Sequence, residues 1–177
     1  MNENLYSLSI EQSVLSILMI NYGVDEYLDA LNEDDFHATR HITIFNLIKT
    51  RYLEAKSYDV EIICDMAQKN PSIGFDVDYI VDLNVNGMGS AHRMADYVER
   101  LKEYARRRAL FNAGEKIKVI AGDITQYDVI EAVAQSESVL AKLENNKDSD
   151  TTHEAFDLSV ELLGDLVERK KKKKNGT

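Results

Sequence analysis

The sequence predicts an all-α protein. Apolar residues recur at spacings of three and four over most of the 177 residues, and no stretch alternates apolar and polar residues as a strand does. The chain has one proline, Pro71, and eight glycines, so few positions break a helix. The expected architecture is a small helical bundle, a long antiparallel helical hairpin and a detached amphipathic helix.

Residues 1–88 are predicted to form the bundle, called the head below. Ser9 and Gln12 have the form of a capping box, and Asp59 is a candidate N-cap. Pro71 ends the helix that follows Asp59, because proline has no amide hydrogen to donate. Together with the apolar spacing, these signals place head helices at about 9–22, 24–31, 39–55, 59–69 and 77–83.

Residues 89–144 are predicted to form the hairpin that completes this N-terminal domain. A long helix is expected over 90–121 and a second arm over 127–144, with a turn at Gly122-Asp123. Their apolar residues occupy more faces than a two-helix contact can cover, which predicts self-association. The residues expected at that contact are Tyr97, Leu101, Tyr104, Arg108, Phe111, Val133, Val139 and Leu140.

Residues 145–177 are predicted to form a polar linker, a docking helix over 152–169 and a basic tail. The expected anchors of the docking helix follow each other at steps of four, three and four: Phe156, Val160, Leu163 and Val167. Such a helix has no guaranteed cover in its own chain, so docking into a groove on another chain is expected, with folding back on the hairpin as the alternative. The tail offers a polyanion contact or serves as a solubilising spacer: Lys170, Lys171, Lys172, Lys173 and Lys174.

The net charge of −10 is distributed unevenly. Residues 1–88 hold 5 basic and 15 acidic side chains, whereas residues 89–121 hold 8 basic and 4 acidic ones. An acidic head repels phosphate, which favours protein partners for it. The run Arg106-Arg107-Arg108 fans through about 200° of a helix, so it does not form one phosphate track. One of these arginines is expected to be half-buried against acidic groups of the second arm.

Three motifs resemble the N-terminal domain of the DnaB family of replicative helicases. The first is Glu11-Gln12-Ser13-Val14-Leu15, followed by Ser16 where the family usually has glycine. The second is Asp35-Phe36 with the His-x-x-Ile-Phe run that begins at His41. The third is Tyr97-Val98 followed by Arg108-Ala109-Leu110. The hairpin, linker and amphipathic helix then follow in the family's order.

The resemblance implies a collar that is not itself a catalyst. In the family, hairpins pair into dimers, and three dimers build a hexameric collar above six ATPase domains. The collar receives primase and communicates with helicase loaders, and the docking helix binds the neighbouring subunit's ATPase domain. ATP and Mg²⁺ belong to the motor of the full-length helicase, and DNA contact is expected to be weak or to occur through that motor.

No catalytic residue, cofactor or metal is expected in this chain. A P-loop requires a Gly-Lys pair, and the sequence contains none. His37 and His41 have a spacing that could bind zinc, but His41 is better explained as a helix-start residue. Cys64 lies in an apolar run and is expected to be a small core residue.

Two further functions remain open beside the collar of a helicase. The chain could be a stand-alone helicase-binding regulator, a loader or an inhibitor, that mimics the collar. It could also be a helical dimerisation module without a replication role. No apolar run approaches the roughly 18 residues of a membrane span, and the first apolar stretch lacks a basic leader. We therefore expect no membrane contact and a cytoplasmic location in a bacterial or phage-infected cell.

Overall fold

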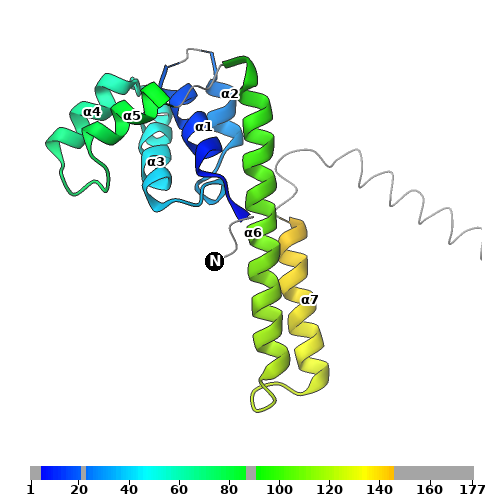
Figure 1. The fold of residues 1–177 in the computed structure, drawn as a ribbon. Helices are drawn as coiled ribbons and strands as arrows, with labels where there is room; N and C mark the ends of the chain where they lie inside the picture. The colour runs from blue at the N-terminus through cyan, green and yellow to red at the C-terminus, as the bar shows by residue number, and fades with distance from the viewer. Residues whose placement is uncertain (1–4, 21–22, 87–90, 146–177) are drawn as a thin grey trace, which may run out of the picture. The chain divides into compact units, whose positions relative to one another are not determined.

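The computed structural model describes residues 5–20, 23–86 and 91–145, and every regular element in these ranges is a helix (Figure 1). The all-α prediction is therefore confirmed. The chain divides into two compact units, Met1–Asn112 and Ala113–Thr177. The elements in order are α1 (Leu8–Ile20), α2 (Asp25–Ala30), the 3₁₀ helix η2 (Glu33–Asp35), α3 (Thr39–Leu53), α4 (Val60–Lys69), α5 (Val77–Asn86), the 3₁₀ helix η3 (Ala91–Arg93), α6 (Met94–Gly122) and α7 (Val129–Asn145).

Local signals explain most of these helix ends, with one correction. The Asp59 side chain accepts a hydrogen bond from the Ile62 amide at 3.0 Å and caps α4, as predicted. The capping box at Ser9 is wrong, because α1 starts at Leu8 and Ser9 lies in its first turn. The Ser9 hydroxyl instead lies 3.1 Å from that of Ser7.

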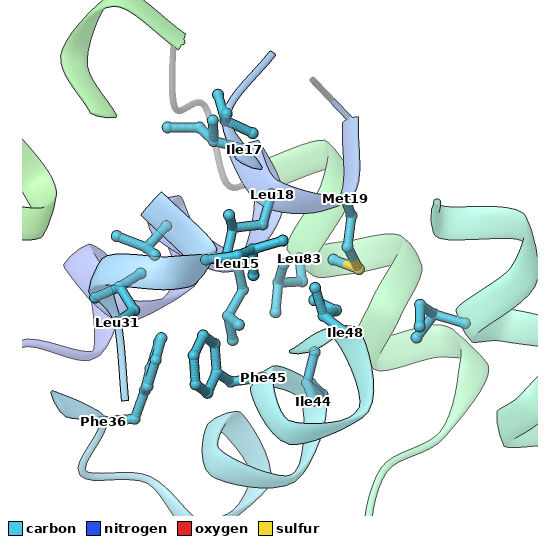
Figure 2. Packing of buried hydrophobic residues seen from close by; sticks show 14 of the residues in the cluster. Leu15, Ile17, Leu18, Met19, Leu31, Phe36, Ile44, Phe45, Ile48 and Leu83 are labelled. Atoms are coloured by element: carbon cyan, nitrogen blue, oxygen red, sulfur yellow. The ribbon is translucent and has the colours of Figure 1, made fainter. Parts of the chain in front are cut away.

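The core of the first unit is built around α1. The helix is buried continuously from Val14 to Met19, so it presents no solvent face over that stretch. Side chains from α3 and α5 meet it, and Figure 2 shows Leu15, Phe45 and Leu83 in this packing. The rings of Phe36 and Phe45 lie 4.8 Å apart, centre to centre. Burial of each such side chain contributes about 1.5 to 3 kcal/mol.

The start of α6 belongs to the same core. Met94, Val98 and Leu101 are buried in the cluster that contains the α1 and α3 side chains. They follow one another at steps of four and three, so they lie on one face of α6. The first half of α6 is therefore a structural part of the head, although the sequence placed it in the hairpin.

The second unit contains the end of α6 and α7, which a short turn joins (Figure 1). The Asp123 carboxylate accepts hydrogen bonds from the amides of Thr125 and Gln126 and shapes that turn. Asp128 and Glu131 form a reciprocal capping box at the start of α7. Among the described residues of this unit, only Ala113 is buried. No helix in the described part of the chain is long and apolar enough to cross a membrane.

Candidate functional site

A buried polar network joins three helices of the head. Glu11 of α1 is fully buried, and its carboxylate lies 2.6 Å from Nδ1 of His41 in α3. The other ring nitrogen of His41 lies 2.5 Å from the hydroxyl of Tyr79 in α5. The backbone amides of His37 and Ala38 also donate to Glu11, at 3.0 and 3.2 Å. The network therefore fixes the start of α3 against α1 and α5.

The Glu11 carboxylate is held in its ionised form. Burial alone would raise the pKa of Glu11, because a charge is poorly solvated inside a protein. The hydrogen bonds from His41, Ala38 and His37 outweigh burial and bring the pKa below its ordinary range. The acid is thus a fully buried anchor for the donors around it.

Arg108 of α6 binds the head through backbone carbonyls. Its guanidinium donates to the carbonyl oxygens of Leu5, Asp34 and Asp35 at distances of 3.1, 2.8 and 2.8 Å. Burial lowers the pKa of Arg108, and the neighbouring carboxylate of Glu11 opposes that shift. One arginine of the Arg106-Arg107-Arg108 run is half-buried, as expected. Its partners were predicted wrongly: they are head carbonyls, because the first half of α6 packs on the head.

The structure separates the eight residues that the sequence assigned to a self-association contact. Leu101 is only 1% exposed in the head core, so it offers no surface to another subunit. Tyr97 packs against the same core and is half-buried. The side chains of Tyr104 and Val139 are also half-buried. Phe111 of α6 is exposed by 47%, and Val133 and Leu140 of α7 are exposed by 53% and 45%.

Further apolar side chains of the second unit are exposed. Val129 and Ile130, both at the start of α7, are each 80% exposed, and Val119 of α6 is also exposed. Val119 and Ile130 were not among the residues that the sequence predicted at the self-association contact. Their apolar character in helices that are otherwise polar was the available signal. We call the exposed apolar residues on the helices of the second unit the hairpin surface: Val119, Val129, Ile130, Val133 and Leu140.

His37, His41 and Cys64 occupy ordinary structural positions. The His37 ring stacks on Tyr6 with 4.1 Å between ring centres, and His41 belongs to the buried network. Within residues 5–20, 23–86 and 91–145, no three His, Cys, Asp or Glu side chains come together as a metal site would require. Burial raises the pKa of the half-buried Cys64 thiol, which disfavours the reactive thiolate. The docking helix at 152–169 and the tail Lys170–Lys174 lie outside the described residues.

Comparisons with known proteins agree with this architecture. The sequence model of the DnaB-like helicase N terminal domain matches residues 3–103. A solved structure, the N-terminal domain of DnaB helicase from Mycobacterium tuberculosis, is similar with a TM-score of 0.68 and 20% sequence identity. That match covers 77% of this chain and 96% of the other, and it supports the fold. A search of curated proteins found no match. Because the family match spans more than half of the sequence, the chain belongs to the family of DnaB-like helicase N-terminal domains.

Proposed function

We propose that the chain forms the collar and linker region of a DnaB-type hexameric replicative helicase and holds its subunits together during DNA replication. The observation that carries this proposal is the hairpin surface. Among the described residues, 6 of the 13 exposed large hydrophobic side chains lie in the second unit, between Val119 and Leu140. Clustered apolar exposure of this kind marks a protein contact rather than a solvated face.

A second copy of the chain is the occupant that best fits the hairpin surface. The second unit has almost no core of its own, because Ala113 is its only buried residue in the described range. Two helices with so little buried area are marginally stable in water. Pairing with another hairpin would remove apolar surface from water at about 25 cal/mol per Å² and would stabilise both. Dimers are the expected unit, and trimers of dimers would complete a hexamer.

The further roles follow from family membership and form part of the same proposal. The collar would receive primase and a helicase loader, and Phe156, Val160, Leu163 and Val167 would dock the linker helix on a neighbouring ATPase domain. The matched N-terminal domain is not the ATPase of these helicases, so ATP and Mg²⁺ would bind the motor domain. The alternative is a stand-alone regulator that mimics the collar, and it would load or inhibit a separate helicase when added to it.

Charge placed on the hairpin surface tests the proposal. Replacing Val119 and Val133 with aspartate is expected to shift the protein from dimer towards monomer in analytical ultracentrifugation at about 100 μM, because buried carboxylates oppose association. Helicity by circular dichroism should persist in the head. Leu53→Asp is the matched control, since Leu53 is 70% exposed on α3, far in sequence from the hairpin. A wild-type chain that stays monomeric at this concentration would contradict self-association.

A further inference from the structure

Arginine and tyrosine alternate along one face of α6. Tyr97, Arg100, Tyr104 and Arg107 follow each other in α6 at steps of three, four and three, and Arg93, the last residue of η3, precedes them by four residues. A seven-residue repeat drifts by only about 20° per repeat on an α-helix, so these side chains share one face. Successive arginines of the repeat lie about 10.5 Å apart along the axis. We call these five residues the arginine–tyrosine stripe.

The stripe lies within the first unit and is accessible. Arg93, Arg100 and Arg107 are exposed, whereas Tyr97 and Tyr104 are half-buried. The face of α6 that carries Val98 and Leu101 packs on the head and holds the helix in place. Arg107 pairs with Glu103 at 2.7 Å, and both side chains are more than half exposed. Such a surface ion pair contributes little to stability, so a phosphate could replace Glu103 at little cost.

The geometry points to a further activity: we propose that the arginine–tyrosine stripe binds single-stranded nucleic acid without sequence preference. Exposed guanidinium groups would pair with phosphates spaced along the strand, because arginine presents a planar set of donors that matches phosphate oxygens. Half-buried tyrosines between them would offer ring faces on which bases stack. The repeat of about 10.5 Å corresponds to about three nucleotides at the stacked spacing of 3.4 Å.

The charge distribution favours a nucleic acid strand over other occupants. Residues 89–121 carry 8 basic and 4 acidic side chains, against 5 and 15 in residues 1–88. A second copy of α6 would bring arginines against arginines along the same repeat, which opposes pairing through the stripe. An acidic helix would satisfy the arginines but would leave the regularly placed tyrosines unexplained. Duplex DNA hides its base faces and could not use the tyrosines.

Fluorescence anisotropy with a labelled oligothymidylate of about 20 nucleotides tests the proposal in the full chain, so that the lysine tail is common to all variants. The triple variant Arg93→Gln, Arg100→Gln, Arg107→Gln is expected to bind at least about 10-fold more weakly at low salt. It should also reduce the slope of log affinity against log salt by about 2, because each lost phosphate contact on a single strand contributes about 0.7. Tyr104→Leu should weaken binding by about 5-fold or more, whereas Tyr104→Phe, which keeps the ring, should bind as the wild type does.

Adjacent residues provide the matched control. Arg106 and Arg107 are both exposed, but Arg106 points about 100° away from the stripe. Arg107→Gln should therefore weaken binding while Arg106→Gln does not.

An oligouridylate arm distinguishes RNA from DNA as the source of the strand. The proposal is overturned if wild type shows no saturable binding at low salt, if both arginine variants lose affinity equally, or if duplex binds more tightly than a single strand. It is also overturned if the triple variant alters sedimentation instead of binding, since the stripe would then be a subunit contact.

Discussion

The buried carboxylate of Glu11 makes the stability of the head depend on pH. In the unfolded chain this carboxyl is solvated and has its ordinary pKa of about 4.3. In the folded chain burial would raise the pKa, but the donors His41, Ala38 and His37 bring it lower. The ionised group therefore stabilises the fold fully above the unfolded pKa. That contribution is lost as the pH falls through the folded pKa.

Glu11→Gln is expected to lower the free energy of unfolding by about 2 to 4 kcal/mol near pH 7, because an amide leaves buried donors unpaired. Near pH 3 the difference from wild type should shrink, since this pH lies below the ordinary pKa and protonation of the carboxyl in the unfolded wild-type chain then opposes folding. Urea unfolding at the two pH values measures both differences. Glu99→Gln, on the exposed side of α6, should have little effect. An equal difference at both pH values would disprove the ionic role of Glu11.

Ser16 of α1 is a second buried polar group, and no hydrogen bond within the described residues offsets the cost of burying its hydroxyl. Its side chain is fully buried, and its hydroxyl has no hydrogen-bond partner among the residues that the structure describes. Ser16→Ala should raise the free energy of unfolding by about 1 to 2 kcal/mol, because it removes the unpaired hydroxyl and improves helix propensity. Ser13→Ala is the control, since the Ser13 hydroxyl donates to the Ser9 carbonyl at 2.9 Å. A variant at Ser16 no more stable than wild type in urea would refute this account.

These two residues also show what the sequence could and could not predict. Glu11 begins a motif that indicated the family and the first helix, and Ser16 follows this motif directly. The partner of Glu11 is 30 residues away, and no periodicity reports such a contact. The sequence also does not predict that α1 is buried on all sides, because an apolar run of that length also fits an ordinary amphipathic helix.

At the scale of elements, helix positions were predictable because their signals are local. Asp59, Pro71 and the glycines act within a few residues, so most predicted ends lie within about three residues of those observed. The prediction that Leu101 lies at the self-association contact depended instead on which neighbour covers an apolar face. Helical spacing identifies the face but not its neighbour. The head covers it here, which the sequence pattern could not show.

Substitution of Arg108 tests how α6 is attached to the head. Its guanidinium reaches three carbonyl oxygens, of Leu5, Asp34 and Asp35, and a single ammonium cannot reproduce that planar set of donors. Arg108→Lys should therefore lower the free energy of unfolding by about 1 to 2 kcal/mol in urea. Arg107→Lys, next to it on the exposed side, should change stability by less than about 0.5 kcal/mol. Equal effects of the two substitutions would remove the structural role of Arg108.

At the scale of the whole molecule, the two units are stabilised differently. The head has a continuous core of side chains from α1, α3, α5 and the start of α6. The second unit exposes Val129, Ile130 and Val133 and buries only Ala113 in its described range. A unit without a core cannot offset the entropy of ordering its helices by itself. Its order should therefore depend on association, whereas that of the head should not.

Hydrogen–deuterium exchange read by mass spectrometry separates the two units within one experiment. Amides of α7 and of 115–122 should exchange more slowly at about 200 μM than at about 2 μM. A 100-fold rise in partner concentration adds up to about 2.7 kcal/mol of protection by mass action. Amides of α1 and α3 should exchange at the same rate at both concentrations, because their core lies within one chain. Val133→Asp should keep α7 in fast exchange throughout and serves as the control. If α7 of the wild type exchanges equally at both concentrations, the second unit is stable without a partner, and the hairpin surface must have another function.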